Sequence, residues 1–143
     1  MTAEPTCLFC RIARGAEPAA RVLETAGVMA FLDHRPLFPG HCLVIPRAHV
    51  ETLGDLPRPL TAPLFGAAAE VARALEAGLG ADGTFVAVNN RVSQSVPHLH
   101  VHVVPRRRGD GLRGFFWPRG RYESAAAMEE TRGRIARALG AGS

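Results

Sequence analysis

Three histidines alternate with apolar residues in the segment 97–105, which reads Pro-His-Leu-His-Val-His-Val-Val-Pro. Successive side chains of a β-strand point to opposite faces, so His98, His100 and His102 would share one face of a strand. The apolar residues between them would pack on a core, which leaves the three imidazoles presented together. Neighbouring histidines of the row would lie about 7 Å apart, so one metal ion could bind two adjacent ones but hardly all three.

Short apolar runs separated by turn residues make up most of the remaining chain. The sequence predicts strands at 21–24, 28–33, 42–45, 85–88 and 99–104, a short turn or helix at 7–14, and helices at 62–78 and 125–139. The main helix has apolar residues at three- and four-residue spacing, with Thr61 as its expected N-cap. This order predicts an α+β fold with a mostly antiparallel sheet of about five strands, one main helix and a C-terminal helix.

Length and composition favour one domain. The 143 residues are 47% hydrophobic and 21% charged, a balance typical of a protein with a real core. We expect a single domain over 1–143, with its core at about 7–106 and a basic, aromatic loop and helical tail at 107–143. The longest apolar stretch is interrupted by charges and the N-terminus lacks a secretory pattern, so no membrane association is expected. Three cysteines form a poor disulfide framework, which favours a reducing cytoplasm.

Every one of the 17 basic residues is an arginine, and the formal net charge is +4. Arginine fits phosphate groups through its planar fork, so anionic ligands are compatible with this charge. The segment 106–119 combines five arginines with three adjacent aromatic residues. We interpret it as a solvated basic loop that leads to an aromatic anchor. The alternative is a lid, with its arginines on distal phosphates and Phe116 or Trp117 near a base. Nucleic-acid binding is not expected, because the run is short and acidic residues are frequent elsewhere.

The histidine row resembles the signature of the histidine triad (HIT) superfamily of nucleotide hydrolases and transferases. That signature is His-φ-His-φ-His-φ-φ, with φ apolar, and residues 98–104 match all seven positions. The similarity also takes in Asp33, the segment 41–49 and the residues 94–96, and it extends over about 7–106. It implies a HIT-like fold, a purine nucleotide or nucleotide conjugate as ligand, and a homodimer.

The resemblance also implies a chemistry. In this family the middle histidine, here His100, attacks the α-phosphorus of a nucleotide and forms a covalent nucleotidyl-histidine that water hydrolyses. An imidazole suits this task because it is largely neutral and nucleophilic at cellular pH, provided that an acceptor holds the proton of its other ring nitrogen. His102 would donate to the phosphate oxygens, and Asp33 would accept hydrogen bonds from the ribose hydroxyls. The remaining substrate-binding residues implied by the resemblance are Asn89, Gln94 and Ser95.

The loop before the row departs from the family pattern. Family members usually carry Asn-x-Gly-x-x-x-Gly-Gln there, whereas the segment 89–94 is about two residues shorter and has Ser93 in place of the glycine before Gln94. Either Asn89 or Asn90 could contact the phosphate, and the sequence leaves both open.

Cys7 and Cys10 form a Cys-x-x-Cys pair, which is either a pair of small apolar residues or half of a zinc site. Some HIT proteins hold a structural zinc with two N-terminal cysteines, a mid-chain histidine and the first histidine of the triad. The resemblance therefore implies a ligand set of Cys7, Cys10, His49 and His98. Four protein ligands leave no open position, so the zinc would be structural.

The expected activity is hydrolysis or transfer at the α-phosphate of adenosine phosphoramidates or related AMP conjugates. Dinucleoside polyphosphate hydrolysis and a catalytically weak nucleotide-binding module are the alternatives. A catalytic metal on His98 and His100 is disfavoured, because a closed site with two cysteines suits His98 better. Two other residues have simpler interpretations. Cys42 is expected to be a buried apolar residue, and His41 is either a brace for the row or an ordinary loop residue.

Overall fold

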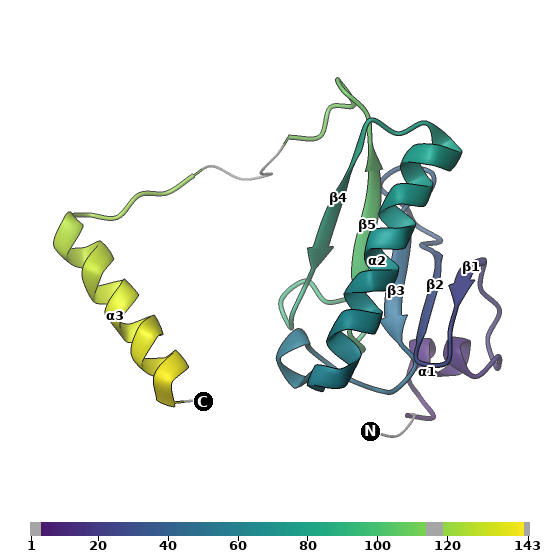
Figure 1. The fold of residues 1–143 in the computed structure, drawn as a ribbon, viewed down its shortest axis with the longest axis horizontal. Helices are drawn as coiled ribbons and strands as arrows, with labels where there is room; N and C mark the ends of the chain where they lie inside the picture. Colours follow the sequence, from purple (N-terminus) through teal and green to yellow (C-terminus); the bar gives the residue numbers. More distant parts are fainter. Residues whose placement is uncertain (1–3, 114–118, 142–143) are drawn as a thin grey trace. The chain divides into compact units, whose positions relative to one another are not determined.

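The structure is a computed structural model that describes residues 4–113 and 119–141 (Figure 1). The backbone falls into two compact units, Met1–Asp110 and Gly111–Ser143. The elements are α1 (Leu8–Ala13), β1 (Arg21–Glu24), β2 (Val28–Leu32), β3 (Cys42–Pro46), the 3-10 turn η1 (Leu53–Asp55), α2 (Arg58–Leu79), β4 (Gly83–Val88), β5 (Val101–Arg106) and α3 (Ala125–Ala141). A single domain over 1–143 stays a prediction. No helix in the described ranges is both long and apolar enough to cross a bilayer.

The first unit is built on an antiparallel five-stranded sheet in the order β1-β2-β3-β5-β4. The predicted α+β fold is therefore confirmed. The alternation of side chains in the central strands gives the sheet two buried faces, since β3 is buried at all five positions.

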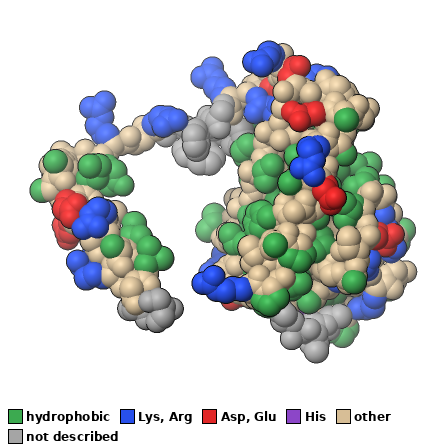
Figure 2. Space-filling model, viewed as in Figure 1, with side chains coloured by type: hydrophobic (Ala, Val, Ile, Leu, Met, Phe, Trp, Pro, Cys, Tyr) green, Lys and Arg blue, Asp and Glu red, His purple; other side chains and the backbone are tan. Residues whose placement is uncertain are grey.

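The helix α2 covers one face of the sheet. Leu64, Val71 and Leu75 of the helix pack there on Val44 and Val101 of the strands. Figure 2 views this side and shows hydrophobic side chains over α2 and the adjoining strands, with no histidine among the described residues visible there. The opposite face holds a second cluster formed by α1 and the alternate positions of β2 and β3: Phe9, Ile12, Met29, Phe31, Leu43 and Ile45.

Several predicted boundaries are wrong: β4 begins at Gly83 instead of 85, β5 ends at Arg106 instead of 104, and two further elements begin at other residues. The helix α2 begins at Arg58 instead of 62, and Pro57 instead of Thr61 occupies the N-cap. Pro59 lies in the first turn and has no N–H that needs a partner. The helix therefore starts without a side-chain cap. The last strand begins at Val101 instead of Leu99, because the Leu99 N–H donates to the Val50 carbonyl, 2.6 Å away, and not to a strand of the sheet.

The second unit contains α3, close to the predicted 125–139. The Ser124 hydroxyl accepts the N–H of Ala127 at 3.0 Å and caps the helix. The aromatic residues 115–117, on which the lid interpretation depends, lie outside the described residues.

Candidate active site and metal cluster

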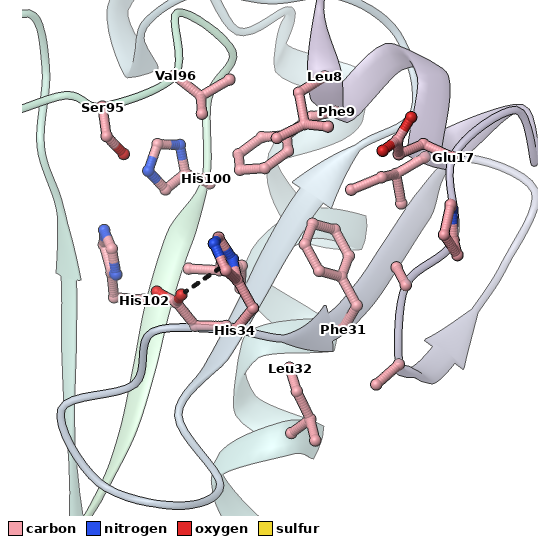
Figure 3. Close-up of a pocket in the computed structure, with 16 residues that line it drawn as sticks. Leu8, Phe9, Glu17, Phe31, Leu32, His34, Ser95, Val96, His100 and His102 are labelled. Carbon is pink, nitrogen blue, oxygen red and sulfur yellow. Dashed lines mark ion pairs between the residues drawn. The ribbon is translucent and has the colours of Figure 1, made fainter.

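A cavity of about 530 Å³ lies on the face of the sheet opposite α2 (Figure 3). His100, His102 and Ser95 line it together with Asp33. Apolar side chains of α1, β2 and β3 line the rest, among them Phe9, Phe31 and Leu43. The cavity therefore joins a polar end, formed by predicted site residues, to an apolar part that the sequence did not reveal, because apolar lining residues look like core.

The histidine row spans the start of β5. Only His102 lies in the strand itself, where it is paired with Leu43 of β3. His98 and His100 precede the strand and are 0% and 3% exposed. The rings of His100 and His102 are 5.0 Å apart, and the Phe9 ring meets His100 edge-on with centroids 5.1 Å apart. The apolar residues of the row turn to the α2 side, as the period of two predicts.

The proton on His100 is placed by a backbone carbonyl. Its Nδ1 lies 2.7 Å from the carbonyl oxygen of His98. A carbonyl only accepts, so Nδ1 carries the proton and Nε2 keeps its lone pair. His100 therefore offers an unprotonated nitrogen beside the cavity, the form that a nucleophile requires.

The proton on His102 is placed by a chain that we call the histidine relay: the Leu37 N–H, His41 and His102. The Leu37 N–H donates to Nδ1 of His41 at 3.1 Å, so His41 carries its proton on Nε2. That nitrogen lies 2.9 Å from Nδ1 of His102 and donates to it. His102 is left with its own proton on Nε2 and is a hydrogen-bond donor.

Burial keeps the relay neutral. Desolvation lowers the pKa of His102 to about 4, and the neighbouring His100 and His41 act in the same direction. Desolvation also lowers the pKa of His41, against the attraction of the Asp33 carboxylate. That carboxylate lies 3.8 Å from Nε2 of His41. Both imidazoles are therefore neutral at cellular pH, and each donates a single N–H.

The loop before the row is held by its own amide side chains. Gln94 accepts the Arg91 N–H at 2.8 Å and donates to the Glu51 carbonyl at 2.7 Å. The side-chain oxygen Oδ1 of Asn90 accepts the N–H of Leu53 at 2.8 Å. The Gln94 amide thus braces the loop in this structure, and its contact with a substrate stays a prediction.

Ser93 occupies the place at which the family pattern has a glycine. Its φ is +61°, in the left-handed region that glycine adopts most readily. Arg91 has a φ of +68° as well. The loop keeps the glycine conformation without the glycine.

Four ligand atoms meet at the other end of the row, in a group that we call the metal cluster: Cys7, Cys10, His49 and His98. Sγ of Cys7 and Nδ1 of His98 are 3.3 Å apart, and Sγ of Cys10 lies 3.3 Å from Nδ1 of His49. In a tetrahedral zinc site with ordinary bond lengths, a sulfur and a nitrogen ligand are about 3.6 Å apart. The cluster is therefore able to hold a metal ion.

Backbone groups orient the ligands of the metal cluster. Nε2 of His98 lies 2.8 Å from the Pro46 carbonyl and donates to it, which turns the lone pair of Nδ1 toward the sulfurs. Burial lowers the pKa of His98 to about 4, so the ring is neutral, as a metal ligand must be. Burial raises the pKa of the Cys10 thiol, so metal binding would release its proton. Cys42 is buried in the α2-side core, as predicted.

Two arginines of the basic segment stabilise the fold. The Arg106 guanidinium binds both oxygens of Asp110, at 2.6 and 2.9 Å. Arg107 donates to the carbonyls of Leu79 and Gly80, at 2.6 and 2.7 Å, and so caps the C-terminus of α2. Neither guanidinium is arranged as a phosphate clamp.

Comparison with known proteins found similar sequences and similar solved structures. The family model of the HIT domain matches residues 14–109. An uncharacterized HIT-like protein of Mycobacterium tuberculosis is 42% identical over 108 residues, 74% of this chain and 75% of that protein. The adenosine 5′-monophosphoramidase hnt1 of Schizosaccharomyces pombe is 34% identical over 115 residues, 79% of this chain and 84% of that protein. A solved Zn-bound histidine triad family protein of Mycobacterium smegmatis is 38% identical, with a TM-score of 0.72 over 93% of this chain and 97% of its own.

Proposed function

This chain belongs to the HIT family, and from that premise we propose that it hydrolyses nucleoside 5′-phosphoramidates, adenosine phosphoramidates and related AMP conjugates being the first substrates to test. The relative named as an adenosine 5′-monophosphoramidase supports this substrate class. The observation that carries the proposal is the hydrogen bond from Nδ1 of His100 to the His98 carbonyl, because it leaves Nε2 unprotonated beside the cavity.

The proposed reaction has two displacements at phosphorus. Nε2 of His100 attacks the α-phosphorus, a bond from phosphorus to the imidazole forms, and the bond from phosphorus to the amine breaks. Water then attacks the same phosphorus and releases His100. One water is consumed in all: its oxygen stays on the phosphate, and a proton ends on the amine. The Nε2–H of His102 stabilises the charge on the phosphate oxygens during both steps.

The remaining residues position the nucleotide. Asp33 lines the cavity near the relay and accepts hydrogen bonds from the ribose hydroxyls. Ser95 lines the cavity and contacts the phosphate from the loop before the row, and Gln94, the residue before it, braces that loop. Of the two asparagines, we assign the phosphate contact to Asn89, because the side chain of Asn90 is held against η1 by the hydrogen bond from the Leu53 N–H to its Oδ1.

We propose that the metal cluster holds a structural zinc ion. Its two sulfurs and two imidazole nitrogens are a donor set that zinc prefers, and they are already close to tetrahedral spacing. The Zn-bound relative supports the same identity. The bound ion would cross-link α1 to the segment that carries His100 and would take no part in the reaction.

The proposed setting is a cytoplasmic homodimer. Cys7, Cys10 and Cys42 are unpaired and buried, which suits a reducing compartment. The family resemblance supports the dimer. The proposed ligand is a purine nucleotide or its conjugate. Nucleic acid is not a proposed partner.

Trapping the covalent intermediate tests the proposal. The protein is mixed with adenosine 5′-phosphoramidate, quenched in acid-free conditions after milliseconds, and analysed by mass spectrometry. We expect an AMP adduct on His100. The variant His100→Asn should give no adduct and lose about 10³-fold or more of kcat, with AMP affinity unchanged within a few-fold. Turnover without an adduct on the protein, or an adduct on another residue, would overturn the mechanism.

A further inference from the structure

The cavity has a second acidic residue that the proposed reaction does not use. Glu17 lines it from the loop between α1 and β1. In Figure 3 the Phe9 ring lies between His100 and Glu17, so the two polar groups lie toward different ends of the cavity. Asp33, the other acidic lining residue, belongs to the end with His102.

The Glu17 carboxylate retains hydrogen-bonding capacity. Within the described part of the chain, its ion-pair partner is the Arg11 guanidinium, with Oε2 and Nε 3.7 Å apart. That separation is too long for a hydrogen bond. The two side chains are 41% and 33% exposed, and ion pairs at such exposure contribute little to stability. The fold therefore does not explain why this acid lines an otherwise apolar wall.

The position of Glu17 relative to a bound nucleotide follows from the proposed function, on which this inference rests. With the α-phosphate at His100 and the ribose at Asp33, the base enters the apolar part of the cavity, against Phe9 and Phe31. The ribose is attached to one edge of a purine, so the Watson–Crick edge points away from the phosphate. That edge would face Glu17.

We propose that Glu17 reads the Watson–Crick edge of the base and selects guanine nucleotides over adenine nucleotides. Guanine presents two adjacent donors there, N1–H and one hydrogen of the 2-amino group, and a carboxylate accepts both at once. Adenine presents only one donor, the 6-amino group, and the lone pair of its N1 opposes the carboxylate. Inosine keeps N1–H but lacks the 2-amino group, so it should rank between them.

The expected preference is about tenfold. A hydrogen bond to a charged group at the weak end of its range corresponds to about tenfold in affinity, and the partial exposure of Glu17 argues for that end. The apolar contacts with the base are the same for both purines and do not contribute to the ratio.

The test compares the binding of GMP, IMP and AMP by titration calorimetry, together with kcat/KM for the guanosine, inosine and adenosine phosphoramidates. The wild-type protein should bind GMP about tenfold more tightly than AMP, with IMP between them. In Glu17→Gln the GMP-to-AMP ratio should fall to one or below, because the amide opposes the second donor of guanine with its own N–H and matches the donor and the lone pair of adenine. Glu70→Gln on α2, which removes an acid from the opposite side of the sheet, should keep the wild-type ratio.

The binding data separate this inference from the proposed function. Equal affinities for GMP and AMP in the wild type, or a ratio that Glu17→Gln leaves unchanged, would overturn the role of Glu17 whatever the activity. A preference for GMP that disappears in Glu17→Gln, in a protein that hydrolyses none of the three phosphoramidates, would support the role of Glu17 and overturn the proposed reaction.

Discussion

The metal cluster and the histidine relay lie at opposite ends of one histidine row. Both use histidine side chains, but with the proton directed in opposite ways. In the metal cluster, the Pro46 carbonyl accepts a hydrogen bond from Nε2–H of His98, which leaves the lone pair of Nδ1 for a cation. In the relay, the Leu37 N–H donates to Nδ1 of His41, which places the proton on Nε2 and directs it to His102. A backbone acceptor thus makes one histidine a ligand, and a backbone donor makes another a hydrogen-bond donor.

His100 lies between the two groups and depends on both. Its proton is held by the carbonyl of His98, a residue of the metal cluster, while its ring contacts His102 of the relay. Damage at the two ends of the row should therefore have different consequences. Loss of the metal cluster should reduce stability first, whereas loss of the relay should reduce the rate and leave stability nearly unchanged.

The largest effect is expected from Cys10→Ser. The weaker oxygen ligand should reduce zinc from about one ion per chain to a trace and cost about 3 kcal/mol of folding free energy, which lowers Tm by about 10 °C or more. Elemental analysis and thermal unfolding of protein never exposed to added metal measure both. Cys42→Ser is the matched control, because Cys42 is equally buried, but its thiol donates to the Gly40 carbonyl and lies outside the metal cluster. If both variants retain zinc and unfold alike, the metal cluster does not hold the ion.

The second-largest effect is expected from His41→Leu, which interrupts the relay. Without its donor, Nδ1 of His102 can take the proton, so kcat should fall about tenfold to a hundredfold with little change in KM. His41→Gln offers both an acceptor for the Leu37 N–H and a donor for His102, and should recover most of kcat.

The pH profile distinguishes this role from a general packing defect. In His41→Leu the acid limb of kcat should change position, whereas in His41→Gln it should stay near that of the wild type. Zinc content should be unchanged in both. Equal rates in the two variants would show that His41 supports the site by its volume and not through its proton.

Periodicity predicted the sheet and the placement of the row well. Alternating apolar residues specify which face of β3 and β5 is buried, and this alternation alone is enough to place the imidazoles opposite α2. The start of α2 was missed because Pro57 opens it without a side-chain cap, a signal weaker than Thr61. The start of β5 was missed because its boundary depends on the carbonyl of Val50, far away in sequence.

Several residues expected at the site lie together in the structure, and their roles stay predictions, whereas their hydrogen bonds could not be predicted. The proton positions come from backbone atoms of Leu37, Pro46 and His98, and no sequence pattern specifies which of them faces a ring. His41 could not be separated from an ordinary loop histidine for the same reason. Glu17 belongs to no sequence motif, because only the folded path of the loop before β1 brings it to the cavity.

The smallest effect expected concerns the stability of the relay in acid. His102, which faces His100, His41 and Asp33, has a folded pKa of about 4, below its ordinary value of 6.5. Between these values the unfolded chain binds the proton more readily, so the free energy of unfolding is complete above pH 6.5 and falls as the pH drops toward 4. The contribution lost between pH 7 and pH 5 is about 1–2 kcal/mol. His102→Asn should lack this pH-dependent contribution to the free energy of unfolding. The contribution of His98 is common to the variant and the wild type, so it cancels in their difference. Denaturant unfolding at both pH values measures this difference, and equal losses in the two proteins would show that His102 is not the source of the acid sensitivity.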